Sequence, residues 1–114
     1  MKIVSGKFKG RVLKGPNDNS IRPTSNRARE MIFSTLNSFL LKDKKSLSDL
    51  KVLDCFCGTG ALGIEAISRG AKKVIFIDNS NKAIDICRKN CLELKIEKST
   101  KIIQSDFTKE KKEY

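Results

Sequence analysis

The stretch Lys51-Val-Leu-Asp-Cys-Phe-Cys-Gly-Thr-Gly-Ala-Leu-Gly63, together with residues 64–78 that follow it, decides the fold. Its first six residues form a short apolar run that predicts a strand, and the glycines that follow predict a tight turn. Residues 64–69 indicate a helix that ends at Gly70, a residue favoured just beyond helix ends. The run Lys73-Val-Ile-Phe-Ile-Asp78 is nearly all apolar, as expected of a strand buried on both faces.

The sequence after this stretch continues the alternation of strand and helix. Asn79-Ser80 open a helical pattern whose apolar residues share one face, and residues 100–106 predict a third strand. Strand, helix, strand, helix, strand is the order of a doubly wound α/β sheet with parallel strands. The sequence therefore predicts the α/β class.

The segment before this stretch is different in character. Residues 2–14 alternate loosely between apolar and polar side chains and predict a short antiparallel β-hairpin, and residues 15–26 have loop composition. Apolar residues recur at helical spacing from position 27 to about 41, with Ser25 or Asn26 as the cap. We therefore expect a basic amino-terminal hairpin and loop over residues 1–26, close to RNA and cofactor, and an incomplete cofactor-binding α/β domain over residues 27–114.

The glycine turn Gly58-Thr-Gly60-Ala-Leu-Gly63 matches G-x-G-x-x-G directly after a strand. Glycines are needed where the chain turns sharply and a ligand comes close to the backbone. Asp78 ends the next strand, where a carboxylate can accept hydrogen bonds from ribose hydroxyls. These features fit either a dinucleotide or S-adenosylmethionine.

Two further acids separate these ligands. Asp54 ends the first strand, where its carboxylate would repel a pyrophosphate but can hold the ammonium group of a bound methionine moiety. Asp106 ends the third strand, where it can accept from an adenine amino group, although a turn-forming Asp is the alternative there. This order of acids is that of a class I methyltransferase, and S-adenosylmethionine is the expected cofactor.

The chain has 114 residues and a formal net charge of +11, with eight basic and two acidic residues among the first 30. This concentration indicates a polyanionic partner such as nucleic acid, although a compositional bias towards lysine would give the same excess. The sequence contains neither a membrane-spanning run nor a secretory signal at its start, so the expected location is the cytoplasm. The chain has no His, and we predict that Cys55, Cys57, Cys87 and Cys91 are free thiols that pack as buried small hydrophobic residues and form no metal site.

Several segments resemble one known family. Val52-Leu-Asp-Cys-Phe-Cys-Gly-Thr-Gly-Ala-Leu-Gly-Ile-Glu-Ala66, followed by Ser68-Arg-Gly-Ala71, is similar to the bacterial 16S ribosomal RNA (guanine-N2)-methyltransferase family, RsmD. Residues 3–11 and the segment Arg22-Pro-Thr-Ser-Asn-Arg-Ala-Arg-Glu30 resemble the opening segments of that family. The resemblance implies the amino-terminal half of a Rossmann-like methyltransferase, with S-adenosylmethionine as donor and a guanine exocyclic amine of 16S rRNA as acceptor.

The resemblance also implies roles for individual residues. Those expected to line the cofactor are Asp54, Gly58, Gly60, Asp78, Asp106 and Thr24. Those expected to face the RNA are Lys7, Lys9, Arg11, Arg22, Arg27 and Arg29, and for each of them a solvated surface without a ligand is the alternative.

The family's catalytic motif, Asn/Asp-Pro-Pro-Tyr/Phe after a fourth strand, is not found in the sequence, because its only prolines are Pro16 and Pro23. We therefore assign no catalytic residue here and expect the motif beyond Tyr114, in a longer methyltransferase of which this chain is the cofactor-binding half. The isolated chain is expected to be inactive in methyl transfer and to bind the cofactor weakly at best. Its partners are expected to be 16S rRNA or the small ribosomal subunit and a possible second polypeptide that completes the sheet, the chain being otherwise monomeric.

Two alternatives stay open at this point. A nicotinamide-dependent oxidoreductase would use the same glycine turn, but Asp54 argues against it. A non-catalytic RNA-binding module would keep the turn only as scaffolding, and its RNA affinity would not depend on Asp54.

Overall fold

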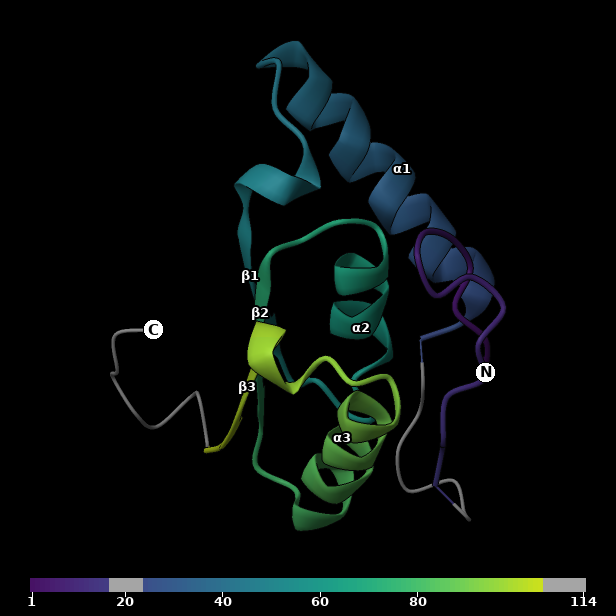
Figure 1. Ribbon diagram of the computed structural model, residues 1–114, viewed down its shortest axis with the longest axis vertical. Helices are drawn as coiled ribbons and strands as arrows, with labels where there is room; N and C mark the ends of the chain where they lie inside the picture. Colours follow the sequence, from purple (N-terminus) through teal and green to yellow (C-terminus); the bar gives the residue numbers. More distant parts are fainter. Residues whose placement is uncertain (17–23, 106–114) are drawn as a thin grey trace.

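A computed structural model describes residues 1–16 and 24–105 (Figure 1). Its centre is a parallel sheet of three strands, β1 (Lys51–Cys55), β2 (Lys73–Asp78) and β3 (Thr100–Gln104), in the order β1-β2-β3. Strands β1 and β2 pair without interruption, from Lys51 opposite Lys73 to Cys55 opposite Ile77. The predicted α/β class with parallel strands is confirmed.

Two helices connect the strands, and both lie on the same side of the sheet (Figure 1). Helix α2 (Ala61–Ser68) joins β1 to β2, and α3 (Asn81–Glu93) joins β2 to β3 through the short 3₁₀ helix η2 (Glu97–Ser99). Val74 and Phe76 of β2 belong to the apolar core that the helices share with the sheet. Residues of both helices are therefore fixed relative to the strand ends.

Helix α1 (Asn26–Lys42) precedes the sheet and packs against α2 (Figure 1). Its cap is Ser25, one of the two predicted caps, whose hydroxyl accepts from Ala28 N at 3.1 Å. The connector to β1 contains one turn of 3₁₀ helix, η1 (Leu47–Asp49). Within the described residues, no helix combines the length and the apolar character needed to cross a membrane.

The predicted amino-terminal hairpin is reduced to one antiparallel bridge, between Lys2 and Val12. The segment between them turns through Gly6 and Gly10, both with positive φ, and its backbone docks on α2: Lys7 N donates to Ser68 O at 2.7 Å. Because these amides bond to the helix, the segment does not form the two regular strands that the alternation predicts. We call residues 1–16 the arm.

All four cysteines are free, and Cys57, Cys87 and Cys91 are buried as predicted, whereas Cys55, at the end of β1, is only half-buried. Hydrogen bonds with the thiols of Cys57 and Cys91, together with burial, raise the pKa of Cys87 and keep it neutral. Among residues 1–16 and 24–105, no group of His, Cys, Asp or Glu side chains is arranged to hold a metal ion.

Candidate functional site

The glycine turn lies at the carboxyl end of β1 and leads into α2. Gly60, with φ 89°, is the N-cap of α2, and a Cβ atom there would lie 2.7 Å from Cys87 Sγ. A Cβ atom on Gly63 would lie 2.4 Å from the ring of Phe76, so this glycine allows α2 to pack closely on β2. Gly58 also has a positive φ, of 55°. The glycines thus meet the conformational and packing demands that the motif predicts.

Asp78 joins the glycine turn to the beginning of α3. Its Oδ2 accepts from Gly58 N at 2.9 Å, and its Oδ1 accepts from Ser80 N at 3.0 Å. An ionised carboxylate has about four acceptor positions, so both oxygens keep capacity for a ligand hydroxyl. The remaining acceptor positions of Asp78 therefore lie beside the glycine turn, at the end of β2.

Asp54 is almost fully buried, with 8% of its surface exposed. Its Oδ2 accepts from Gly63 N at 3.1 Å, which satisfies an amide in the first turn of α2 that the side-chain-free cap Gly60 cannot satisfy. Burial raises the pKa of Asp54 to about 6, opposed by the Gly63 hydrogen bond and reinforced by the negative charge of Asp78. Among the described residues, no Lys or Arg pairs with this carboxylate.

This position of Asp54 bears on which ligand can bind. In dinucleotide-binding folds the pyrophosphate sits at the N-terminus of the helix after the glycine turn. Here a carboxylate already bonds to the Gly63 amide in that turn of α2. A second anion would be repelled, whereas a cationic group beside Asp54 would stabilise its ionised form.

Phe56 is a feature of the site that the sequence analysis did not single out. It directly follows β1, has φ 59° and is 68% exposed. Positive φ is a true outlier for a bulky residue, and such strain is concentrated at functional sites. The only signal in the sequence is its place next to the glycine turn.

The residues expected to face RNA divide into two groups in the structure. Lys7, Lys9, Arg11 and Arg27 are exposed, whereas Arg29 is completely buried. The expectation that Arg29 faces RNA is therefore wrong for this structure. Arg22 and the cofactor candidate Asp106 lie outside the described residues.

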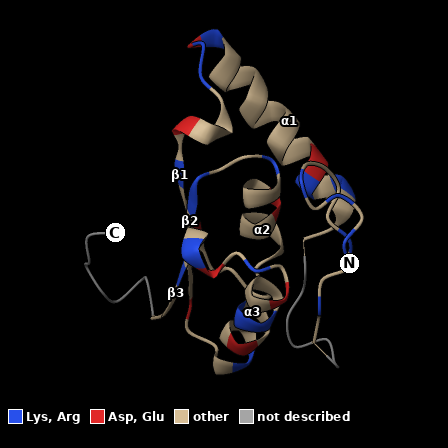
Figure 2. Cartoon of the chain, viewed as in Figure 1, with Lys and Arg blue, Asp and Glu red and all other residues tan. Residues whose placement is uncertain are grey.

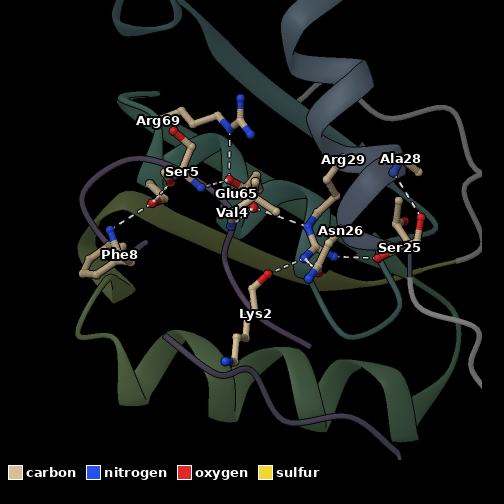
Figure 3. A network of polar contacts seen from close by, with 12 residues as sticks. Lys2, Val4, Ser5, Phe8, Ser25, Asn26, Ala28, Arg29, Glu65 and Arg69 are labelled. Atoms are coloured by element: carbon tan, nitrogen blue, oxygen red, sulfur yellow. Dashed lines mark hydrogen bonds and ion pairs between the residues drawn. The ribbon is translucent and has the colours of Figure 1, made fainter. Parts of the chain in front are cut away.

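Arg29 instead belongs to a buried polar network centred on Glu65 of α2 (Figure 3). One Glu65 oxygen accepts from Arg29 Nε at 3.3 Å and from Val4 N at 2.9 Å, and the other accepts from Ser5 N and Arg69 Nε. Although burial raises the pKa of Glu65, these backbone and Arg69 hydrogen bonds outweigh it and hold the pKa below its ordinary value. The one hint in the sequence is an acidic residue within an otherwise apolar helix.

The guanidinium of Arg29 also orders the segment before α1. Its Nη1 donates to the carbonyl oxygen of Thr24 at 2.5 Å, and its Nη2 donates to the Lys2 carbonyl and to Asn26 Oδ1 (Figure 3). Thr24, a half-buried cofactor candidate, is thereby connected through Arg29 to the arm and to α2. Sequence reasoning missed this role because Arg29 and Glu65 are far apart along the chain.

Asn90 of α3 provides a second connection between the arm and the site. Its buried amide accepts from Lys14 N at 2.8 Å and donates to the carbonyl oxygens of Lys14 and Thr59, both at 3.1 Å. Thr59 lies between the two glycines of the turn. The end of the arm and the glycine turn therefore share one side chain as their support.

Comparison with known proteins agrees with this geometry. The family described as Conserved hypothetical protein 95 matches residues 1–114. The chain belongs to this family, the RsmD family. It is 36% identical over 106 residues to the Bacillus subtilis "Putative rRNA methyltransferase YlbH", covering 93% of this chain and 54% of the relative. It is also 36% identical over 95 residues to "Ribosomal RNA small subunit methyltransferase D" of Escherichia coli, covering 83% of this chain and 44% of the relative.

Among solved structures, the RsmD-family chain is similar to the "Putative methyltransferase yhhF" of Escherichia coli, with a TM-score of 0.76 and 30% identity. The likeness covers 93% of this chain and 52% of that one. The fold is therefore consistent with the amino-terminal half of a Rossmann-like methyltransferase. The chain spans about half the length of the curated relatives that it matches.

Proposed function

We propose that this RsmD-family chain provides the S-adenosylmethionine-binding part of a methyltransferase that modifies the N2 amine of a guanine in 16S rRNA. The observation that carries the proposal is Asp54, a buried carboxylate without a cationic partner among the described residues, beside a glycine turn. The names of the relatives, rRNA small subunit methyltransferases, support the reaction class.

In this proposal each residue has a stated task. When bound, S-adenosylmethionine supplies an electrophilic methyl group. Asp54 holds the ammonium group of its methionine part, directly or through water, and Asp78 accepts from its ribose hydroxyls. Gly58 and Gly60 allow the ligand to approach the backbone, and Asp106 and Thr24 are proposed to contact its adenine and methionine ends.

RNA and catalysis require more than the cofactor site. The exposed cations Lys7, Lys9, Arg11 and Arg27 are proposed to contact the RNA, as is Arg22. An exocyclic amine must also be positioned by acceptors before it can attack a methyl group, and the Asn/Asp-Pro-Pro-Tyr motif that would do so is not in the 114 residues. The chain alone is therefore proposed to bind the cofactor but to transfer its methyl group negligibly.

The proposed second polypeptide concerns the free edge of β1. This strand is terminal in the sheet order, and the exposed apolar side chains of Leu53 and Ile32 lie among the residues that line a hollow of about 140 Å³ beside it. An unpaired edge with apolar neighbours favours the addition of another strand. A polypeptide that supplies this strand would also extend the cofactor edge past Asp54.

Calorimetric titration with S-adenosylhomocysteine tests the proposal. We expect the wild-type chain to bind it, and Asp54→Asn to weaken binding by roughly tenfold or more, the effect of losing about 1.4 kcal/mol from one charge-assisted hydrogen bond. Asp85→Asn is the matched control, because Asp85 is an exposed acid of α3 that lies 3.9 Å from Arg88, away from the glycine turn. Binding of NADH without binding of S-adenosylhomocysteine would instead support the oxidoreductase.

A separate measurement addresses the non-catalytic module. In that alternative the chain binds RNA with an affinity that Asp54→Asn leaves unchanged, and neither cofactor produces a thermal shift. Detectable transfer from labelled S-adenosylmethionine to small-subunit RNA by the isolated chain would contradict the proposed inactivity.

A further inference from the structure

A hollow of about 450 Å³ lies near the amino-terminal ends of β2 and β3, whereas Asp54 and Asp78 lie at the carboxyl ends of the strands. Its walls come from four segments: the arm, the turn between α2 and β2, the end of α3, and η2. Four lysines line it, with no acidic residue: Lys7, Lys72, Lys95 and Lys98. Figure 2 shows the basic segments before β2 and before β3 in blue.

Within residues 1–16 and 24–105, no acidic side chain pairs with the lysines of this hollow. All four lysines are exposed. Lys7 lies over the ring of Phe8, 5.4 Å from its centroid. Four ammonium groups around one hollow repel each other, so an anion that enters is favoured by all of them.

A second basic hollow provides a comparison. The hollow between the arm and α3 is lined by Lys14, Lys82 and Lys89, but also by Asp85, and Lys14 lies 3.9 Å from Glu93. Its cations therefore already have acidic neighbours. The four-lysine hollow has no acid among its lining residues, which also include the apolar Phe8, Ile67, Leu94 and Ile96.

We propose that this four-lysine hollow binds the phosphodiester backbone of the substrate RNA at a point remote from the methyl-transfer site. The inference rests on the proposed function, since it takes RNA as the substrate. Lys72 directly precedes β2, whereas Asp78 ends it, so about 15–20 Å of strand separates the two points. Because phosphates recur every few ångströms along an RNA strand, one RNA can reach both points, and the hollow adds affinity without taking part in the chemistry.

Fluorescence anisotropy with a labelled RNA hairpin tests this inference. We expect Lys72→Ala/Lys98→Ala to weaken binding by roughly tenfold at moderate salt and to reduce the slope of log affinity against log salt by about 2, one for each phosphate that is no longer neutralised. Lys42→Ala/Lys45→Ala removes the same charge at the far end of α1 and is expected to change both quantities much less. Circular dichroism establishes that both variants are folded.

Two results would overturn the inference: equal losses in the two double variants, which would reflect net charge alone, or no loss in either. Titration with S-adenosylhomocysteine separates this outcome from a failure of the proposed function. The lysine variants are expected to bind that ligand as the wild type does. A wild type that binds RNA through the hollow but not S-adenosylhomocysteine would contradict the cofactor assignment and leave the hollow in place.

Discussion

Two buried carboxylates, Glu65 and Asp54, lie within about a helix turn of the same glycine segment along the chain, and their surroundings differ. Glu65 receives two backbone amides and two guanidinium groups, and its pKa is held below the ordinary value. Among the described residues, Asp54 receives one backbone amide and no guanidinium, and burial raises its pKa to about 6.

The difference indicates what each acid does. Burial of a carboxylate is unfavourable unless charge and hydrogen bonds compensate it. Glu65 is compensated entirely by the protein, so its role is to hold the arm, α1 and α2 together. Asp54 is compensated in part, so a cationic ligand can supply what is missing. A buried acid with an incomplete set of partners is a candidate binding residue.

The largest expected effect comes from removing Glu65, the carboxylate whose hydrogen bonds and ion pairs are all supplied by the protein. Glu65→Ala leaves Arg29 and Arg69 without their carboxylate and is expected to lower the free energy of unfolding by about 3–5 kcal/mol, measured by urea denaturation. Glu93→Ala makes the same substitution at an exposed acid of α3 and is expected to cost less than about 1 kcal/mol. Equal effects of the two substitutions would show that the Glu65 network contributes little.

Replacing Asp54, the carboxylate with few partners, is expected to change the free energy of unfolding in the opposite direction. The pKa of Asp54 is about 6 in the folded chain against an ordinary 3.8, so its ionised form opposes folding fully above pH 6 and not at all below about pH 4. Asp54→Asn is therefore expected to raise the free energy of unfolding by about 2–3 kcal/mol at pH 8, from two pKa units at 1.36 kcal/mol each, while it weakens S-adenosylhomocysteine binding.

Urea denaturation of wild type and Asp54→Asn across pH measures this effect. The stability gain of the variant is expected to shrink as pH falls through 6, because the folded wild type then takes up a proton that the unfolded chain does not. A variant that is less stable than wild type at pH 8 would make the charge of Asp54 a favourable helix cap and would remove the contrast with Glu65.

A smaller effect sharpens the role of the Glu65 network in holding the arm. Gly6 and Gly10 have similar positive φ values, 89° and 84°. A Cβ atom on Gly6 would lie 2.0 Å from Ser68 O, whereas a Cβ atom on Gly10 would have no other atom within 4 Å in the described part of the chain. Gly6→Ala is expected to lower the free energy of unfolding by about 1–3 kcal/mol more than Gly10→Ala. Equal costs would mean that the close approach of the arm to α2 is not required.

Much of the fold followed from local patterns. The apolar runs that became β1 and β2 and the glycine turn between β1 and α2 were predicted at nearly their observed positions, because strand and helix periodicity is written in neighbouring residues. Asp54 and Asp78 were predicted at the strand ends for the same reason. The same pattern predicted their contacts with a ligand, and those contacts stay predictions.

The remaining features depend on contacts between distant segments. The basic sequence around Arg29 is the same whether its side chain faces RNA or Glu65. Only the packing of α1 on α2 decides that Arg29 is buried. Asn90 reaches Lys14 across 76 positions, and the hairpin predicted over residues 2–14 became a docked arm because α2 offered partners for its amides. None of these contacts leaves a periodic signal.

The sequence by itself determined the α/β order, the glycine turn and the positions of Asp54 and Asp78 at the strand ends, since short-range spacing fixes secondary structure and parallel connections fix which strand ends meet. Only the tertiary structure decided which charges are compensated: it surrounded Glu65 with donors, left Asp54 with one, and gathered four lysines from four segments around a single hollow. Charge compensation depends on distances in space, and those distances exist only once the chain has folded.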